Sequence, residues 1–516
     1  MVSKIYSATL TGILPRLVEV ETSCTPGLRT FSVVGLPNES IKEAKERIGV
    51  AIKSINLSPP FKEALRVLIN LIPADFKKEG TCFDLPIALG FLLASKQTKF
   101  DSSSKLIVGE LGLDGALKPI KGALSFACLA KEFGFKEIIL PKENAAEAAL
   151  LNYKNSSSFK ITGLTNLKEV IFYLEGKINV ENFILDSEKI FKTKLNFEID
   201  FSWIKGQEYA KRALEIAAAG AHNMLMFGPP GAGKTLLAKS MTSILPKLEL
   251  EEILELTKIY SAANLLAEKE ILNQRPFRTP HHASSEIALL GGGNPFKIGE
   301  ITLAHRGILF LDELPEFHRD VLESLRQPME EGKITISRSK YSFTLPAQFS
   351  LVAAANPCPC GYLNEPEKEC ICTNSQIAGY KRKLSGPMID RIDIFIEVPS
   401  LKYEKLISTE EQNLFEKIKE RVTLARKIQK ERFKKDSSAL LSLTNSEMKI
   451  PQIKKYCQIN EKASVLLKKY VDSGKLTARG FHRVLKVSRT IADLAGEKDI
   501  SFENVAEALM YRSKER

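Results

Sequence analysis

A glycine-rich loop at residues 228–235 is the segment of the chain best suited to chemistry. It reads GPPGAGKT, follows an apolar run at 223–227 and precedes a helical pattern at 236–241. Strand, glycine loop and helix in this order typify a phosphate-binding P-loop. We expect Lys234 to neutralise the β- and γ-phosphates of ATP and Thr235 to ligate Mg²⁺. The other residues of the loop are Gly228, Pro229, Pro230, Gly231, Ala232 and Gly233.

Two acidic residues at the end of an apolar run supply the second half of a nucleotide site. Asp312 and Glu313 directly follow the run Ile308–Leu311. This pattern is typical of a Walker B segment, in which the first carboxylate holds the Mg²⁺ shell and the second polarises the attacking water. A merely solvated strand end is the alternative. Together with the P-loop, the segment predicts an ATP hydrolase.

Two further polar residues lie beside later apolar runs. Asn356 ends one run, where its amide could orient the lytic water beside Glu313. Arg391 precedes the last run and could pair with Asp390 or Asp393. It could instead reach the γ-phosphate of a neighbouring subunit, where such an arginine raises the rate by about 10³–10⁵.

Adjacent histidines, His281 and His282, lie between the two nucleotide motifs. Histidine is a common metal ligand, so a metal site is one use for the pair. Consecutive residues point in different directions on a strand or a helix, however. We therefore expect the pair to serve in hydrogen bonding or packing.

Residues 332–345 alternate apolar and polar side chains over two short stretches. This alternation predicts a β-hairpin. Arg338 and Lys340 fall near its tip and Lys333 at its base. We expect these three cations to contact phosphates, with a solvated surface hairpin as the alternative.

Four of the eight cysteines are clustered, and the other four are scattered singly. The cluster consists of Cys358, Cys360, Cys370 and Cys372. Its two C-x-C pairs are separated by nine residues, which is enough chain to close around one tetrahedral ion. Zn²⁺ suits four thiolates best. Free thiols or a redox pair are the alternatives.

Length and composition bound the classes of protein that remain. At 516 residues the chain exceeds the roughly 250–300 that one core supports, so we expect two or three domains. With 44% hydrophobic and 26% charged residues, a wholly disordered or fibrous chain is excluded. The net charge of +12 fits nucleic acid, an anionic surface or simple solubility. No apolar run reaches the roughly 18–20 residues of a membrane span, and no signal peptide opens the chain, so we expect a cytoplasmic protein without membrane contact.

The apolar runs predict a multidomain α/β protein that positions these residues. Residues 1–175 mix strand-like runs at 18–21, 31–34, 66–70 and 137–140 with helical patterns such as 39–53, which indicates an α+β domain. Residues 176–200 are expected to be a linker. Residues 201–400 alternate buried runs with amphipathic helices, the pattern of a parallel sheet in an αβα P-loop core, and they include the cysteine-rich loop 358–372. Residues 401–516 predict a helical domain.

Taken together, these segments resemble the ComM/YifB family of magnesium-chelatase-like AAA+ ATPases. The resemblance rests on GPPGAGKT, ILFLDELPEF, FRTPHH, GGGNP, AANPCPCG and SGPMIDRID, and on VGLPNESIKEAKERI and INLIPADFKKEG near the N-terminus. It implies that Asn356 is a first sensor, Arg391 a trans-acting finger and Arg479 a second sensor on a helical lid. It also implies a helix-2 insert at 291–300 and a pre-sensor hairpin at 333–348.

The resemblance further implies a Lon-protease-like fold for residues 1–175. A Lon-type protease needs a serine nucleophile and a lysine base. Here the stretch after Gly80 reads TCFD, and the segment expected to carry the base reads ALSF, at residues 123–126. Neither dyad residue is present. We therefore expect a non-proteolytic scaffold or a DNA-binding module.

What the family implies is a homohexameric, ATP-driven translocase or helicase that moves single-stranded or branched DNA during recombination of incoming DNA. The alternative is a chelatase-type motor that remodels a protein partner. No acidic, integrin-like metal-binding domain follows the ATPase segments, which disfavours this alternative. A peptide-handling protease is disfavoured by the missing dyad.

Overall fold

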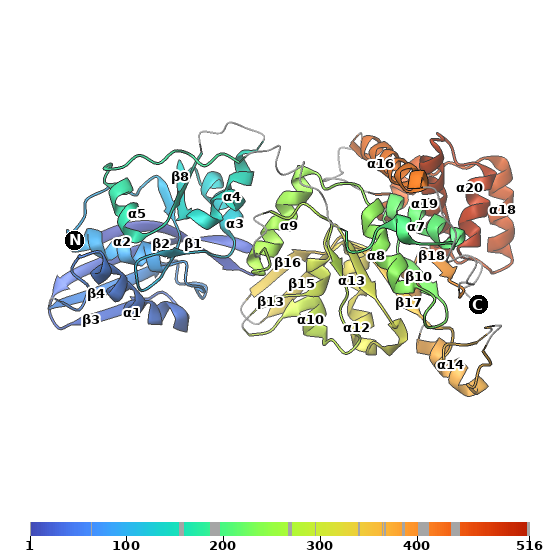
Figure 1. The fold of residues 1–516 in the computed structure, drawn as a ribbon, viewed down its shortest axis with the longest axis horizontal. Coiled ribbons are helices and arrows are strands. Elements are labelled where there is room, and N and C mark those ends of the chain that lie inside the picture. Colours follow the sequence, from blue (N-terminus) through green and yellow to red (C-terminus); the bar gives the residue numbers. More distant parts are fainter. Residues whose placement is uncertain are drawn as a thin grey trace. The chain divides into compact units, whose positions relative to one another are not determined.

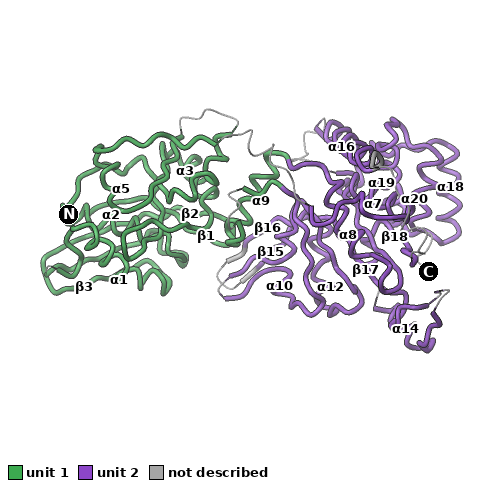
Figure 2. The backbone as a smooth tube through the Cα atoms, in the orientation of Figure 1, with its two compact units in different colours: residues 1–193, 249–273 green, residues 194–248, 274–516 purple. Residues whose placement is uncertain are grey.

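A computed structural model describes residues 2–62, 64–153, 159–185, 197–266, 271–294, 296–338, 341–363, 365, 368–383, 388–400, 412–434 and 444–512. The chain forms two compact units. The first unit contains residues 1–193 and 249–273, and the second contains residues 194–248 and 274–516. Figure 1 labels the elements, and Figure 2 colours the two units.

A seven-stranded mixed sheet organises the first unit, with the strand order β3-β4-β2-β1-β5-β8-β9. The strands and the helix expected from the apolar runs are confirmed as parts of β2, β3, α1, β4 and β8. The longest apolar run of the sequence forms α2, which is buried on nearly all sides. The elements are β1 (Val2–Thr11), β2 (Leu14–Pro26), β3 (Thr30–Val34), α1 (Glu39–Ser54), β4 (Leu65–Ile72), α2 (Asp84–Ala94), β5 (Lys105–Ile107), β6 (Glu110–Leu111), β7 (Leu117–Lys118), α3 (Ala123–Glu132), β8 (Glu137–Pro141), α4 (Ala145–Ala149), β9 (Lys160–Leu164), α5 (Leu167–Leu174) and α9 (Leu250–Ala262).

The TCFD stretch at the start of α2 is part of the core. Cys82 is buried, and its Sγ donates a hydrogen bond to the Ala8 carbonyl at 3.3 Å. Burial raises the pKa of this thiol to about 12, so it stays protonated near neutral pH. A protonated, buried thiol is a poor nucleophile.

A buried ion pair holds the next acid of the same stretch. The Arg47 guanidinium donates to both carboxylate oxygens of Asp84, at 2.9 and 3.0 Å. Burial nevertheless raises the pKa of Asp84 to about 6, although the charge of Arg47 opposes the shift. The pair therefore joins α1 to α2 at a cost in solvation that Arg47 offsets only in part.

Helix α9 belongs to the first unit, although the sequence predicts a single ATPase core over residues 201–400. Its Ser261 Oγ accepts a hydrogen bond from the Gly122 backbone N–H at 2.7 Å. The same hydroxyl hydrogen-bonds the buried carboxyl of Glu147. Because α9 contacts α3 in this way, residues 249–273 belong to the first unit and not to the unit with the parallel sheet.

The expected linker at 176–200 is only partly separate from the first unit. The Phe183 backbone N–H donates to the Ile161 carbonyl at 3.0 Å, and the Asn182 side chain accepts from the Ile161 N–H at 2.8 Å. Val180, Phe183 and Leu185 pack against the core of the first unit. Residues 176–185 therefore extend that unit, and residues 186–196 lie outside the described part of the chain.

A five-stranded parallel sheet forms the core of the second unit, with the order β11-β14-β17-β10-β18. Each of its four long strands coincides with an apolar run expected to be buried. The elements of this part are α7 (Glu208–Gly220), β10 (Met224–Phe227), α8 (Lys234–Ile244), β11 (Phe277–Arg278), α10 (Glu286–Leu290), β12 (Gly291–Gly292), β13 (Lys297–Ile298), α11 (Glu300–Leu303), β14 (Ile308–Leu311), α12 (Arg319–Ser324), α13 (Arg326–Glu331), β15 (Lys333–Arg338), β16 (Tyr341–Pro346), β17 (Ser350–Ala355), α14 (Asn374–Lys383) and β18 (Ile394–Glu397).

The described remainder of the second unit is helical, as the loss of strand-like runs predicted. Its helices are α16 (Gln412–Lys434), α17 (Ile450–Tyr456), α18 (Glu461–Asp472), α19 (Ala478–Ala495) and α20 (Phe502–Met510). The second unit is therefore a mixed α/β unit with a parallel-sheet core and a helical C-terminal region.

A buried polar network joins the helical region to the sheet. His222 Nε2 lies 2.7 Å from Thr490 Oγ1 on α19, and Arg483 of the same helix donates to Asp393 at 2.5 Å. Burial opposes ionisation of Asp393, but the charge of Arg483 and the contact with His222 hold the pKa of Asp393 well below its usual range. The network therefore fixes α19 against the strand that begins next to Asp393.

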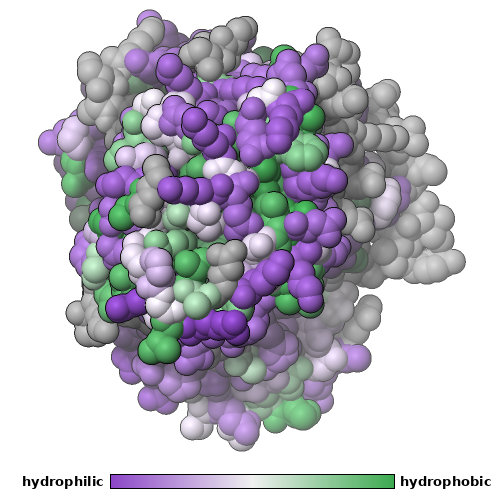
Figure 3. Space-filling model, turned by 90° about the vertical axis from the view of Figure 1, so that its left-hand side faces the viewer, coloured by the Kyte–Doolittle hydropathy of each residue, from purple (hydrophilic) through white to green (hydrophobic). Residues whose placement is uncertain are grey.

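One face of the molecule is mixed in character. Hydrophilic and hydrophobic residues are interspersed over the face drawn in Figure 3. Among the helices of the described ranges, none is both long and apolar enough to cross a membrane.

The Arg47–Asp84 pair generates a stability prediction. Arg47→Ala should lower the local free energy of unfolding around α2 by about 3 kcal/mol at pH 8, because it leaves a buried carboxylate without its partner. The folded-state pKa of Asp84 lies above its ordinary value of 3.8, so its ionised form costs stability as the pH rises through that range. In the Arg47→Ala protein the pKa of Asp84 should rise above 6, because its charge partner is gone. The loss of unfolding free energy should therefore be smaller at pH 6, where more of Asp84 is protonated, than at pH 8.

Amide hydrogen exchange of α2 at the two pH values, corrected for intrinsic exchange rates, measures the effect. Arg29→Ala is the control, because Arg29 is exposed. An equal loss at both pH values would show that the charge of Asp84 is not the cause.

Candidate functional site

The P-loop leaves β10 and enters α8, as its sequence predicts. Lys234, the first residue of α8, donates through Nζ to the Gly228 and Pro229 carbonyls at 2.7 and 2.9 Å. Gly228 is required by packing, because a Cβ there would lie 2.2 Å from the Val398 carbonyl oxygen. The loop is thus held in a tight curve between β10 and α8, the context in which the backbone amides of a P-loop bind phosphate.

The Walker B carboxylates lie beside the P-loop hydroxyl. Thr235 Oγ1 donates to Asp312 Oδ2 at 2.8 Å. The Glu313 backbone N–H donates to Asp312 Oδ1 at 3.0 Å, and Glu313 has a left-handed φ of 51°. A hydroxyl and a carboxylate this close can supply two of the oxygen ligands that Mg²⁺ takes.

Asn356 completes the group at the end of β17. Its Oδ1 accepts a hydrogen bond from Lys234 Nζ at 3.1 Å. Burial lowers the pKa of Lys234 from its usual range, while the carboxylates of Asp312 and Glu313 oppose the shift. The structure therefore brings together Lys234, Thr235, Asp312 and Asn356, which the sequence placed at the ends of three separate runs.

Two further residues belong to this group and were not predicted as site residues. His282 Nδ1 lies 3.3 Å from the Glu313 carboxylate, and its ring packs on His281 with centroids 4.1 Å apart. Gln207 has left-handed backbone angles, and its Nε2 donates to the Ala232 carbonyl of the P-loop at 3.0 Å. The histidine pair thus serves in polar contact and packing, as expected. Gln207 carries no signal in the sequence beyond its place before an amphipathic helix.

The two predicted arginines make contacts within their own chain. Arg391 is buried, with an exposed fraction of 8%, and its guanidinium pairs with Glu330 of α13. Arg479, in the first turn of α19, is largely exposed and lies 3.8 Å from an Asp390 carboxylate oxygen. Residues 390–393 therefore contribute to three features. They include Arg391 itself, the Asp390 carboxylate beside Arg479, and Asp393 of the buried polar network.

The predicted hairpin is confirmed as β15 and β16, which pair antiparallel from Lys333 opposite Pro346 to Arg338 opposite Tyr341. Lys333 is exposed at its base, and its Nζ lies 4.0 Å from Glu331. Arg338 ends β15, where only its backbone is described, and Lys340 lies outside the described residues. The helix-2 insert expected at 291–300 contains the small hairpin of β12 and β13.

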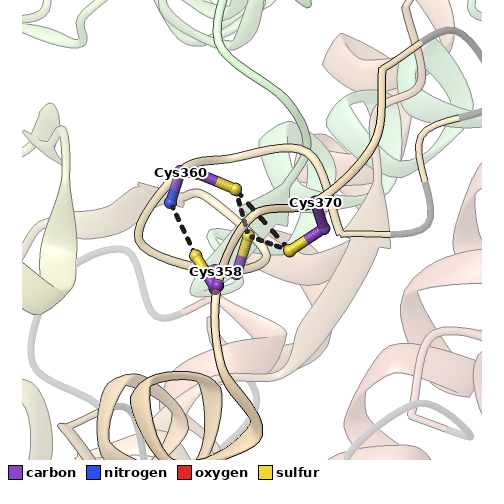
Figure 4. A group of neighbouring side chains, drawn as sticks. Cys358, Cys360 and Cys370 are labelled. Carbon is purple, nitrogen blue, oxygen red and sulfur yellow. Dashed lines mark hydrogen bonds between the residues drawn. The ribbon is translucent and has the colours of Figure 1, made fainter.

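The four clustered cysteines lie close together, and Figure 4 labels three of them, Cys358, Cys360 and Cys370. Cys358 Sγ lies 3.4 Å from Cys360 Sγ and 3.7 Å from Cys370 Sγ, and the latter two sulfurs are 3.6 Å apart. All four sulfurs, that of Cys372 included, lie within 4.8 Å of one another. A tetrahedral Zn²⁺ with bonds of about 2.3 Å would separate its sulfurs by about 3.8 Å. The spacing and the donor set therefore both fit Zn²⁺.

Comparison with known proteins places the chain in a family. Models described as "Magnesium chelatase, subunit ChlI", "Subunit ChlI of Mg-chelatase" and "Magnesium chelatase, subunit ChlI C-terminal" match residues 200–406, 20–144 and 414–512. The competence protein ComM of Haemophilus influenzae is 40% identical over 99% of this chain and 97% of its own length. The chain belongs to the ComM/YifB family of magnesium-chelatase-like proteins.

Other relatives divide by how much of the chain they cover. The ComM/YifB similarity extends to the uncharacterized protein YifB of Escherichia coli, which is 37% identical over 100% of this chain and 97% of its own length. The magnesium-chelatase 38 kDa subunit of Rhodobacter capsulatus is 28% identical over 30% of this chain and 50% of its own length. The similarity to ComM and YifB therefore includes the first unit, whereas the chelatase subunit matches a smaller part of the chain.

Membership of this AAA+ family indicates ATPase activity that uses ATP and Mg²⁺. The residues present fit both groups, because Lys234 and the loop amides are phosphate ligands and Thr235 and Asp312 supply oxygens for Mg²⁺. Glu313 directly follows Asp312, and its carboxylate is the one left to activate the attacking water once Asp312 is assigned to Mg²⁺.

This division of roles predicts two different defects. Lys234→Ala should abolish nucleotide binding, because the phosphates lose their main cation. Glu313→Gln should bind ATP but hydrolyse it about 100-fold or more slowly, because an amide cannot accept the water proton. Steady-state ATPase together with a fluorescent-nucleotide titration measures both effects.

Glu323→Gln serves as the control, because Glu323 is a surface carboxylate paired with Arg319 on α12. Turnover at the wild-type rate in Glu313→Gln would remove Glu313 from the mechanism.

Proposed function

We propose that the protein is a cytoplasmic, homohexameric DNA translocase that uses ATP to promote branch migration during recombination of incoming DNA, as in natural transformation. The observation that carries this proposal is an AAA+-type nucleotide site in a chain that is similar to a competence protein over 99% of its length. Single-stranded or branched DNA is the substrate. The first unit serves as a Lon-protease-like scaffold without proteolytic activity.

In the proposed cycle, Lys234 holds the phosphates and Thr235 and Asp312 hold Mg²⁺. Glu313 accepts the proton of the attacking water, and Asn356 orients that water. Arg479 acts as the second sensor on the lid. Bound Mg²⁺ supplies charge neutralisation at the phosphates.

Arg391 acts in trans in this proposal. Its pairing with Glu330 keeps a buried guanidinium neutralised within its own chain. In a ring, the phosphate of a neighbouring subunit offers Arg391 a stronger partner than the half-exposed Glu330. Hydrolysis then takes place only where two subunits meet.

A second candidate function is a chelatase-type motor that remodels a protein partner. It is favoured by the matching family models and by the likeness to the 38 kDa chelatase subunit. That likeness covers only 30% of the chain, whereas the likeness to ComM includes the first unit. We therefore place the chelatase-type motor second.

The hairpin separates the two candidates, because a DNA motor needs cations that grip phosphates. Replacing Arg338 and Lys340 with Ala should weaken DNA binding almost uniformly across sequences. The slope of log K against log salt should fall by about 0.7–0.9 for each phosphate that the variant no longer binds. DNA-stimulated ATPase and strand displacement should disappear, while basal ATPase survives because the hairpin is distinct from the P-loop.

Binding titrations at two salt concentrations and unwinding of a four-way junction measure these effects. Lys462→Ala is the matched control, because Lys462 is exposed on α18. Unchanged affinity in the double variant would leave the hairpin as solvated surface. If the wild-type protein neither binds nor unwinds DNA with ATP present, the partner-remodelling function takes its place.

The cysteine cluster is a Zn²⁺ site in this proposal. Four sulfurs at tetrahedral spacing repel one another as thiolates and need a charge partner when folded. The Tyr362 backbone N–H donates to Cys360 Sγ and is the main cause that lowers the pKa of Cys360 to about 6. Burial and the neighbouring thiols raise the pKa of Cys370 and of Cys372, so the cluster as a whole gives up its protons only when a metal takes their place.

Freshly purified, reduced protein should contain one Zn²⁺ per chain. Cys370→Ser should lose most of it, because one of four ligands is removed, whereas Cys24→Ser should retain it. Metal analysis of chelator-washed protein gives the ratio. Less than about half an equivalent in the wild type would favour free thiols.

A further inference from the structure

The cysteine loop begins directly after the sensor residue Asn356 and is followed by α14. Nothing in its cysteine pattern indicates a role in ATP hydrolysis. Within the second unit, however, one residue inside the loop and one residue on α14 contact the nucleotide site. Gly361 is one of these residues and Tyr380 is the other.

Gly361 lies against the P-loop. It is buried, its φ is +86°, and its backbone N–H donates to the Cys358 carbonyl at 3.0 Å. A Cβ on Gly361 would lie 2.5 Å from Pro230 Cδ and 3.1 Å from Pro230 Cγ. Both the left-handed backbone and the close approach require glycine here. The turn that closes the first cysteine pair therefore supports the P-loop directly.

Tyr380 holds the sensor from the other end of the segment. It is a buried residue of α14, and its hydroxyl oxygen accepts a hydrogen bond from the Asn356 backbone N–H. Burial, assisted by the carboxylate of Glu316, raises the pKa of Tyr380 to about 12. The hydroxyl thus stays neutral and in place at working pH. Lys383, on the last turn of α14, also lies 3.8 Å from Glu316, just beyond the Walker B acids.

These two contacts meet at Lys234. Asn356 Oδ1 accepts from Lys234 Nζ at 3.1 Å, and the same ammonium donates to the Pro229 carbonyl. Gly361 touches the next residue of the loop, Pro230. The P-loop is therefore supported once through its backbone and once through the sensor. Gly361 lies between the two cysteine pairs, and Tyr380 lies on α14, the helix that follows the second pair.

We propose that the cysteine loop is a brace of the ATPase site, in which Gly361 positions the P-loop and Tyr380 positions Asn356. This inference rests on the ATPase and zinc assignments proposed above. Bound Zn²⁺ supplies a rigid cross-link between the two cysteine pairs. Without that cross-link, Gly361 and α14 lose the tie that keeps them against the site. Zinc is then a structural requirement for ATP binding and turnover, in addition to any part the loop plays on DNA.

Two variants separate the two supports. Gly361→Ala should weaken ATP binding about tenfold or more, because displacement of a binding loop by a fraction of an ångström is costly. Tyr380→Phe keeps the ring and removes only the hydroxyl. It should lower kcat several-fold and leave the nucleotide Kd within about twofold, because it frees the amide of the sensor rather than the P-loop. Both variants should retain about one Zn²⁺ per chain.

Full-length protein is used, with nucleotide titration, steady-state ATPase and metal analysis on the same preparations. Gly379→Ala is the control, because a Cβ at this position of α14 meets nothing within 4 Å. Removal of zinc by a chelator should raise the Kd for ATP as Gly361→Ala does, and addition of Zn²⁺ should restore it.

The outcomes are distinguishable from failure of the proposed function. Wild-type Kd and kcat in both variants, with zinc retained, would overturn the brace whatever the protein does to DNA. A wild-type protein that holds no zinc would overturn the zinc dependence and leave the two variants as the test of Gly361 and Tyr380. Parallel loss of zinc and nucleotide binding in Gly379→Ala would show that the loop is merely fragile, which also contradicts the specific contacts.

Discussion

The parallel pairing of β10 with both β17 and β18 is the constraint on which the nucleotide site depends. Because the strands are parallel, their carboxyl ends meet at one edge of the sheet. β10 delivers the P-loop there, β14 delivers Asp312 and β17 delivers Asn356. The distances of 2.8 Å from Thr235 to Asp312 and 3.1 Å from Lys234 to Asn356 follow from this alignment. A shift in strand register would separate these side chains by the length of a residue or more.

The segment 390–393 links the remaining functional parts. Arg391 pairs with Glu330, Asp390 lies near Arg479, and Asp393 receives Arg483 beneath the lid. A change in the tilt of α19 would therefore move residues 390–393, which include the proposed finger Arg391. The cysteine loop enters the site from the sensor side, through Gly361 and Tyr380. The helical region, the proposed finger and the cysteine loop are thus each tied to the sheet edge by a few polar or close contacts.

Local patterns predicted the strands and the P-loop well, because a strand end and the motif attached to it lie next to each other in the chain. Residues 223–235 are the clearest case, and β17 ends directly before Asn356, as its apolar run indicated. Contacts between distant loops could not be predicted. His282 reaches Glu313 and Glu330 reaches Arg391 only because the folded chain brings them together. The placement of α9 in the first unit was missed for the same reason, since it depends on Ser261 meeting Gly122.

Shared hydrolysis between subunits is the central claim, and mixed assemblies test it most directly. Lys234→Ala and Arg391→Ala proteins, each inactive alone, are mixed over a range of ratios and their ATPase rates are measured. We expect hydrolysis to return, because some interfaces then join one intact P-loop to one intact Arg391. Absence of recovery at every ratio, with mixed rings shown to form, would contradict a trans-acting Arg391.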